Sequence, residues 1–146
     1  MATQKQWAAL RAMLDSDWGR HGELARELAA AHDLDTWGTV VGAAYYLAIR
    51  RQFPSGHSSA DVIRLAAEVR ATFDKTGDEF DGRSIELMIR LALGDTKVED
   101  EVDRMADRTA LIAQSLTLAL LAADHRLGDP DEFFREVEAL ATEWGA

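Results

Sequence analysis

The sequence predicts a small all-α protein with a single domain that spans residues 1–146. Ala, Leu, Glu and Arg are abundant, and these residue types favour helices. The two prolines, Pro54 and Pro130, fall where helices are expected to end and begin. Apolar residues make up 47% of the chain, which is enough for a core without disulfides in a sequence that has no cysteine. We expect a bundle of six or seven helices around two buried apolar helices.

Four helices are expected in the first half, each from apolar residues that recur at spacings of three and four. The first covers residues 4–14, and an Asp-Ser-Asp stretch separates it from a second at about 20–32. A third opens on Asp35, a predicted N-cap, and ends near residue 52, before the first proline. A fourth is capped by Ser58 or Ser59 and ends near residue 73.

Residues 84–93 fit two patterns. Apolar side chains alternate at a period of two, as in a strand, but Ile85, Met88, Ile89 and Ala92 also form a helical stripe. The residue types favour a helix, and no second strand is available for pairing. We therefore predict a helix here.

The rest of the chain predicts two more helices. One long helix is expected over residues 97–125, followed by a stop at Gly128. The last helix begins with Asp129 as N-cap and Pro130 at its first position. Glu132 is expected to complete a capping box there.

Two helical segments, 37–49 and 110–123, are apolar almost all round, so they are expected to be covered on every side. Gly38 and Gly42 on the first would let a neighbouring backbone approach closely. The alternative is that one of these helices completes its burial against a second copy of the chain, as a homodimer.

The composition narrows the class of partner. A net charge of −10 weighs against nucleic-acid binding, because phosphates are bound by Lys and Arg, and it favours a basic protein partner. The chain shows neither a signal peptide nor the roughly 20 apolar residues of a membrane span. We expect a cytoplasmic protein that does not enter a membrane.

An acidic stripe is the first candidate site. Asp95, Glu99, Asp103 and Asp107 recur every four residues, so on one continuous helix they would lie along one ridge. This ridge could be a docking face for a basic partner, or simply a solvated surface with arginines beside it. A divalent-cation site is a weaker alternative, because carboxylates along one helix do not converge.

Aromatic residues form the second candidate site. Trp37, Tyr45 and Tyr46 lie on the apolar helix over residues 37–49, where they would line any cavity between the central helices. The simpler interpretation is that they are core and boundary residues. This set motivates the alternative of a small-molecule-binding bundle or a small enzyme.

Motifs for calcium binding, DNA binding, metal binding and nucleophilic catalysis are each incomplete in this sequence. In residues 74–85, an EF-hand would need Gly where Glu79 stands and Glu where Ile85 stands. Residues 24–40 are similar in spacing to a bacterial helix-turn-helix, but the would-be reading helix is apolar and lacks basic side chains before Arg50. The histidines show no zinc or di-iron spacing, and His57 has no nucleophile motif around it.

We therefore predict no cofactor, metal or catalytic residue. The leading hypothesis is a non-enzymatic interaction module that binds a basic protein, as a regulator, adaptor or neutraliser. A DNA-binding regulator, which would need a basic face from Arg50, Arg51, Arg64 and Arg70, is the least favoured hypothesis.

Overall fold

The computed structural model describes residues 1–31, 36–74, 76–77 and 80–146. Over these ranges the chain forms α-helices and one short 3₁₀ helix, without strands, so the all-α prediction is confirmed. In chain order the elements are α1 (Gln4–Leu14), α2 (Trp18–Ala30), α3 (Trp37–Gln52), α4 (Ser59–Phe73), α5 (Gly82–Ala92), η1 (Thr96–Val98), α6 (Glu99–Asp103), α7 (Asp107–Ala123) and α8 (Pro130–Glu143).

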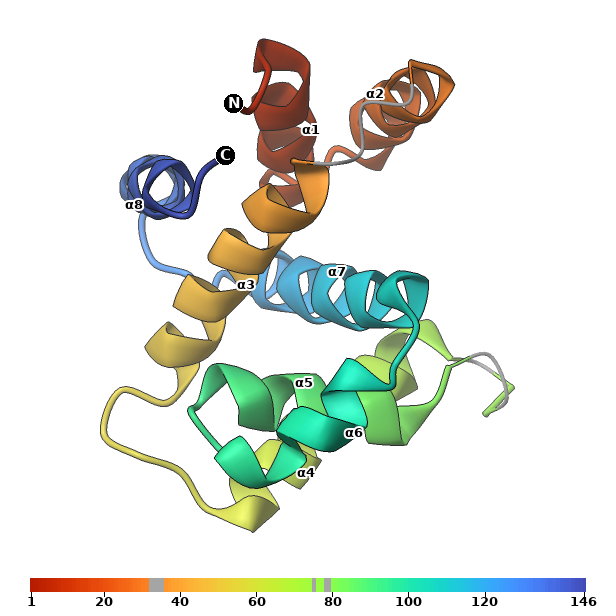
Figure 1. Ribbon diagram of the computed structural model, residues 1–146, viewed down its shortest axis with the longest axis vertical. Coiled ribbons are helices and arrows are strands. Elements are labelled where there is room, and N and C mark those ends of the chain that lie inside the picture. The colour runs from red at the N-terminus through yellow and green to blue at the C-terminus, as the bar shows by residue number, and fades with distance from the viewer. Residues whose placement is uncertain (32–35, 75, 78–79) are drawn as a thin grey trace.

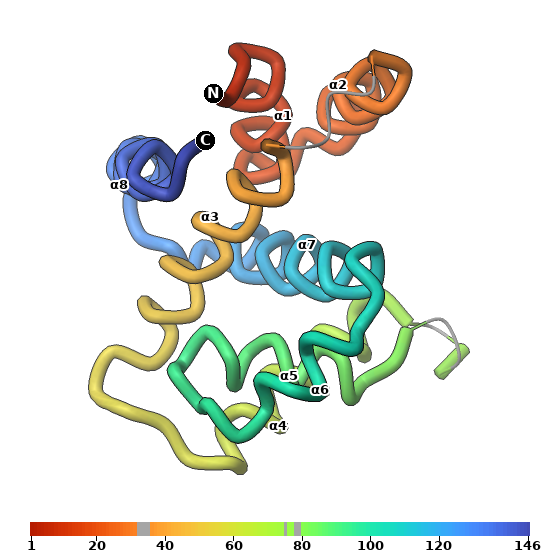
Figure 2. Tube along the Cα trace, in the orientation of Figure 1, coloured from red at the N-terminus to blue at the C-terminus, as the bar shows by residue number. Residues whose placement is uncertain are grey.

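Helices α3 and α7 cross near the middle of the molecule (Figure 1). The α1–α2 pair lies at one end, α4, α5 and α6 lie at the other, and α8 flanks α3 (Figure 2). Helix α3 contacts α1, α5, α7 and α8, whereas α7 contacts α1, α3, α4 and α5. One apolar core runs through all of these contacts and contains Leu10, Val40, Ile89, Leu118 and Phe133.

Local sequence signals account for most helix starts. Ser58 forms a capping box with Asp61 at the start of α4, and Asp81 caps α5. Asp129 caps α8 with Pro130 at the first position, as predicted. The expected box with Glu132 does not form, because the Asp129 carboxylate accepts from the nearer N–H of Asp131. The predicted N-cap Asp35 lies outside the described residues.

A buried glutamine sets the start of α1 and links it to α3. Thr3 and Gln6 form a capping box, in which the Gln6 Oε1 accepts from the Thr3 N–H at 3.0 Å. The same oxygen accepts from the Thr36 hydroxyl at 2.8 Å, just before α3 begins. Gln6 is fully buried, so this one side chain holds two helix starts together inside the core.

The prediction of one helix over residues 97–125 is wrong. Asp95 caps the 3₁₀ turn η1, α6 ends at Asp103, and Ala106 is extended (φ −62°, ψ 140°) before α7 begins. The reason is burial: η1 and α6 pack on α5 and bury Val98, while α7 takes another direction across α3. The ambiguous segment 84–93 lies in α5, so the helix prediction there is confirmed.

The close backbone approach expected at Gly38 and Gly42 is not observed. A Cβ atom added at either glycine would have no neighbour within 4 Å, and Gly38 is exposed. Helix α7 is also not covered all round, since Ile112 is 36% exposed. In the described part of the chain, no helix is long and apolar enough to cross a membrane.

Candidate functional site

Two pockets flank the C-terminal turn of α7, and exposed Ala123 borders both. We call them together the α7-end groove. The first pocket, of about 470 Å³, lies where α1 and α7 end and α8 begins, and is lined by Leu14, Asp15, Ser16, Ala122, Ala123, His125, Leu127, Gly128, Pro130 and Phe133. The second, of about 460 Å³, is lined by Trp18, Glu68, Ala71, Thr72, Phe73, Ala119, Leu120, Ala123 and Asp124.

The surface of this groove is mainly apolar. Leu127 and Phe133 line the first pocket, and Phe73 and Leu120 line the second. Trp18 lies at the second pocket and is 47% exposed, although a large aromatic side chain is usually buried. An apolar lining in two neighbouring pockets that share Ala123, with exposed Trp18 at one of them, is typical of a binding surface.

Unusual backbone geometry occurs at the first pocket. Ser16 (φ 57°) and His125 (φ 55°) are, within the described ranges, the non-glycine residues with positive φ, and both line this pocket. Each follows a helix that ends with a C-terminal capping bond, from Asp17 N–H to the Ala12 carbonyl and from Arg126 N–H to the Leu121 carbonyl. Glycine usually occupies these positions, because other residues lose about 1–2 kcal/mol there.

The rim of the first pocket carries a net negative charge. Arg11 binds Asp15 at 3.1 Å and Asp131 at 2.7 Å, so one cation is shared between a carboxylate just after α1 and a carboxylate of α8. The hydrogen bond to Asp131 raises the pKa of the Arg11 guanidinium. The C-terminal ends of α1 and α7 add partial negative charge at the same place.

Arg126 stabilises the segment that follows α7. Its guanidinium binds Glu68 of α4 at 2.8 Å and the Gln52 side chain of α3 at 2.8 Å. The Asp124 carboxylate lies 3.8 Å from the same group. These contacts fix the position of the second pocket's acidic rim relative to α3 and α4.

The acidic stripe does not form one ridge, because the helix that was to carry it is broken. Asp95 caps η1, Glu99 begins α6, Asp103 ends α6 and Asp107 begins α7. Glu99, Asp103 and Asp107 are exposed, and none of them forms an ion pair with another described residue. The stripe thus consists of one structural carboxylate, Asp95, and three exposed ones.

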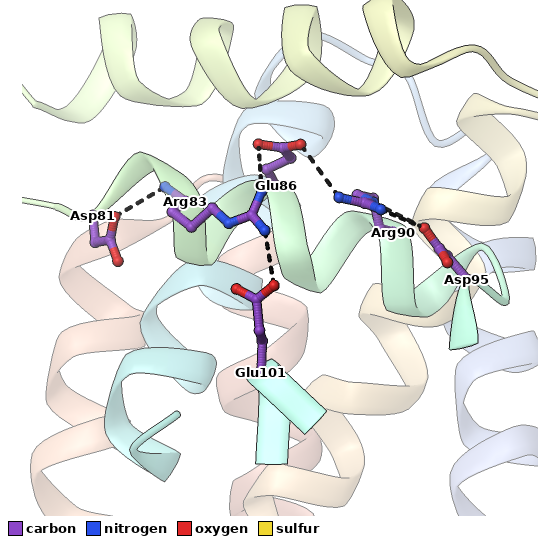
Figure 3. A network of polar contacts seen from close by, with 6 residues as sticks. All are labelled: Asp81, Arg83, Glu86, Arg90, Asp95 and Glu101. Carbon is purple, nitrogen blue, oxygen red and sulfur yellow. Dashed lines mark hydrogen bonds and ion pairs between the residues drawn. The ribbon is translucent and has the colours of Figure 1, made fainter. Parts of the chain in front are cut away.

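Arginines of α5 neutralise part of this acidic region (Figure 3). Arg90 binds Asp95 at 2.8 Å and lies 3.7 Å from Glu86, while Arg83 binds Glu101 at 2.9 Å. The hydrogen bond from Arg90 lowers the pKa of Asp95. This network joins α5 to η1 and α6, so these carboxylates have a structural role.

The three aromatic candidates lie apart, and none of them lines either pocket of the α7-end groove. Trp37 is buried with its ring 6.2 Å from that of His21. Tyr46 is half-buried and packs against Trp144, 5.7 Å between ring centroids. Tyr45 is 2% exposed, and its hydroxyl has no hydrogen-bond partner among the described residues.

The arginines of the DNA-binding hypothesis have carboxylate or aromatic neighbours. Arg51 binds Glu136 at 2.8 Å and Arg64 lies 3.4 Å from Asp61. Arg50 packs over the Tyr46 ring.

In the 74–85 segment, the buried carboxylate of Asp74 accepts from the backbone N–H groups of Gly77 and Phe80. These hydrogen bonds give the Asp74 carboxylate a structural role at the C-terminal end of α4.

Sequence reasoning missed the α7-end groove. The Asp-Ser-Asp stretch after the first helix was interpreted only as a boundary, and the histidines were considered only as metal ligands or catalytic residues. A usable signal was present: both helices end without a glycine at the position where glycine is favoured. This signal does not show that the C-terminal ends of α1 and α7 lie close together, because their proximity depends on the packing of α1 against α7.

Comparisons with protein-family models, with curated proteins and with solved structures find no match for this chain.

Proposed function

We propose that this protein is a non-enzymatic interaction module whose α7-end groove binds a basic, amphipathic segment of a partner protein. The observation that carries the proposal is the apolar surface on both sides of exposed Ala123, bordered by more carboxylates than cations. An amphipathic helix recognises a partner by placing its apolar face in such a groove.

Charge complementarity favours a basic segment. Asp15, Glu68 and Asp124 line the groove, and five more carboxylates lie next in sequence to its lining residues: Asp17, Asp74, Asp129, Asp131 and Glu132. Arg11 and Arg126 bind only part of this set, and each is shared between two carboxylates. A cationic segment would gain favourable contacts along this rim, whereas an acidic one would be repelled.

The remaining charge supports attraction over a longer range. Exposed Glu99, Asp103 and Asp107 add to a net charge of −10, which speeds encounter with a basic partner at low salt. We propose that the acidic stripe acts through this long-range attraction and is not itself the docking face. We also propose that the protein is cytoplasmic, as expected from the sequence.

The test uses a peptide of alternating lysine and leucine clusters that forms a basic amphipathic helix, with a glutamate–leucine peptide as its charge-reversed control. Binding is measured by isothermal titration calorimetry. We expect Ala123→Arg to weaken binding of the lysine peptide by about tenfold or more, because it puts a bulky cation between the pockets. Ala139→Arg on exposed α8 is the matched control and should keep most of the affinity.

Two results would overturn the proposal. One is equal binding of the lysine and glutamate peptides, which would show that charge plays no part. The other is equal affinity of Ala123→Arg and Ala139→Arg. A double variant, Glu99→Lys with Asp103→Lys, separates the two acidic surfaces. If it loses binding while Ala123→Arg does not, the stripe is the docking face and the groove is not.

Self-association is the alternative use of an open surface. Gly38 and Gly42 leave one side of α3 uncovered beside Tyr46 and Trp144, so a second copy could pack there. Sedimentation equilibrium of the chain and of Gly42→Arg distinguishes this homodimer from binding through the α7-end groove. A dimer dissociated by Gly42→Arg would assign the α3 face to self-association.

A further inference from the structure

We infer that the 470 Å³ pocket of the α7-end groove binds a primary ammonium group on an apolar stem. The source of this group is a lysine side chain of the bound basic segment, so the inference rests on the proposed function. Its basis is the combination of an apolar interior with acceptors and negative charge at the mouth.

Acceptors come from two helix ends that meet at this pocket. The backbone carbonyls of Leu14, Asp15 and Ala123, all lining residues, accept no hydrogen bond from the described part of the chain. The last carbonyls of a helix lack intrahelical donors and carry its partial negative charge. An ammonium group has three donors and no acceptor, so it matches a group of free carbonyls.

Charge at the mouth favours the same ligand. Asp15 lines the pocket, and its guanidinium partner Arg11 is shared with Asp131, so the three groups together carry one negative charge. The Ser16 hydroxyl and a neutral His125 ring can each accept a further hydrogen bond there. Ser16 and His125 both have positive φ angles, at which glycine would be less strained.

The interior of the pocket is apolar and can hold the stem of the ligand. A contact beside the pocket shows how a cation binds there. Leu14, Leu127 and Phe133 provide apolar walls. Behind the pocket, Arg51 stacks over the Phe133 ring at 5.1 Å and donates to the Leu127 carbonyl. The Arg51 guanidinium is thus an example of a cation bound by an aromatic ring and by a backbone carbonyl of the segment that follows α7. Glu136 neutralises Arg51, so that cation does not repel a second one strongly.

The experiment uses small probes, so that it does not depend on peptide binding. Hexylammonium, hexan-1-ol and hexanoate share one stem and differ in the charge of the head group. Each is titrated into the ¹⁵N-labelled protein while amide shifts are followed by NMR. We expect shift changes at Ser16, His125 and Leu127, with hexylammonium binding about fivefold or more tightly than hexan-1-ol. Hexanoate should bind weakest.

A matched pair of variants tests the role of the pocket's carboxylate. Asp15→Asn should weaken hexylammonium binding by about threefold, since an exposed ion pair contributes modestly. Asp103→Asn changes the net charge equally on distant α6 and should leave binding unchanged. Equal effects of both variants would show that only the overall field matters and would overturn the inference.

The outcomes separate the two proposals. If the lysine peptide binds in the groove but hexylammonium shows no preference over hexan-1-ol, the inference fails and the proposed function stands. If hexylammonium selectively shifts the pocket but the peptide does not bind, the pocket's selectivity stands and the proposed function fails. Shift changes outside the pocket in every titration would overturn the inference.

Discussion

Removing the Tyr45 hydroxyl should stabilise this protein. Tyr45 is 2% exposed and its hydroxyl has no partner among the described residues, so the folded state leaves a desolvated polar group unpaired. Such a group costs about 1–3 kcal/mol. Phenylalanine fills nearly the same volume without that cost. We expect Tyr45→Phe to raise the free energy of unfolding by about 1 kcal/mol and the melting temperature by about 2–4 °C.

Urea denaturation followed by circular dichroism measures this change. The control is Tyr46→Phe, because the half-buried Tyr46 hydroxyl accepts a hydrogen bond from Arg50 at 3.2 Å. That variant should change the free energy of unfolding by less than about 0.5 kcal/mol. The reasoning is refuted if Tyr45→Phe lowers the stability, because the hydroxyl would then have a favourable native contact.

The pH dependence gives an independent check on the same side chain. Burial raises the pKa of Tyr45 well above its ordinary value of 10.0. Above pH 10.0 the unfolded chain loses the phenolic proton of Tyr45 while the folded protein still keeps it, so rising pH favours the unfolded state. This group should therefore reduce stability by up to about 1.4 kcal/mol per pH unit above pH 10. Tyr45→Phe should remove that part of the slope.

Two further substitutions test other features. Gln6→Ala should cost about 2–3 kcal/mol, because it removes a helix cap and leaves the Thr36 hydroxyl without its acceptor. A loss below about 1 kcal/mol in urea denaturation would show that Gln6 is not the link between α1 and α3. His125→Gly should raise the melting temperature by about 2–3 °C, since glycine adopts positive φ without strain. A lower melting temperature would mean that the imidazole makes a stabilising contact.

Much of the fold was predictable because its signals are local. Ser58, Asp129 and Pro130 mark helix starts through contacts within one turn, and the structure confirms each of them. The choice of helix over strand for residues 84–93 is also confirmed. These cases share one property: the decisive interaction lies within four residues of the position predicted.

The break after α6 was not predictable in this way. Nothing between Arg104 and Ala106 disfavours a helix strongly, and the apolar stripe continues through Met105. The break separates η1 and α6, which pack on α5, from α7, which packs on α1, α3 and α4 as well, and such tertiary contacts are not visible in the local sequence. The acidic stripe was misplaced for the same reason, since its alignment required the helix to be continuous.

The candidate site was even less accessible from sequence. The α7-end groove joins residues from α1, α2, α4, α7 and α8, and only tertiary packing brings them together. The aromatic candidates failed to converge because Tyr45 and Tyr46 are adjacent on α3 and therefore point to different sides of the helix. Composition gives only the net charge of −10, which does not depend on where each residue lies, and the basic partner inferred from it stays a prediction.

The position of α3 between α1, α7 and α8 has a consequence for the newly made chain. On the ribosome, α3 is complete at Gln52, whereas the last turn of α8 at Glu143 follows about 90 residues later. At ~5–20 residues per second, this interval lasts on the order of 5–20 seconds. During that time α3 lacks the contacts that α8 makes with it in the folded protein. Slowed translation between α3 and α8 should therefore increase aggregation of the nascent protein and its need for chaperones.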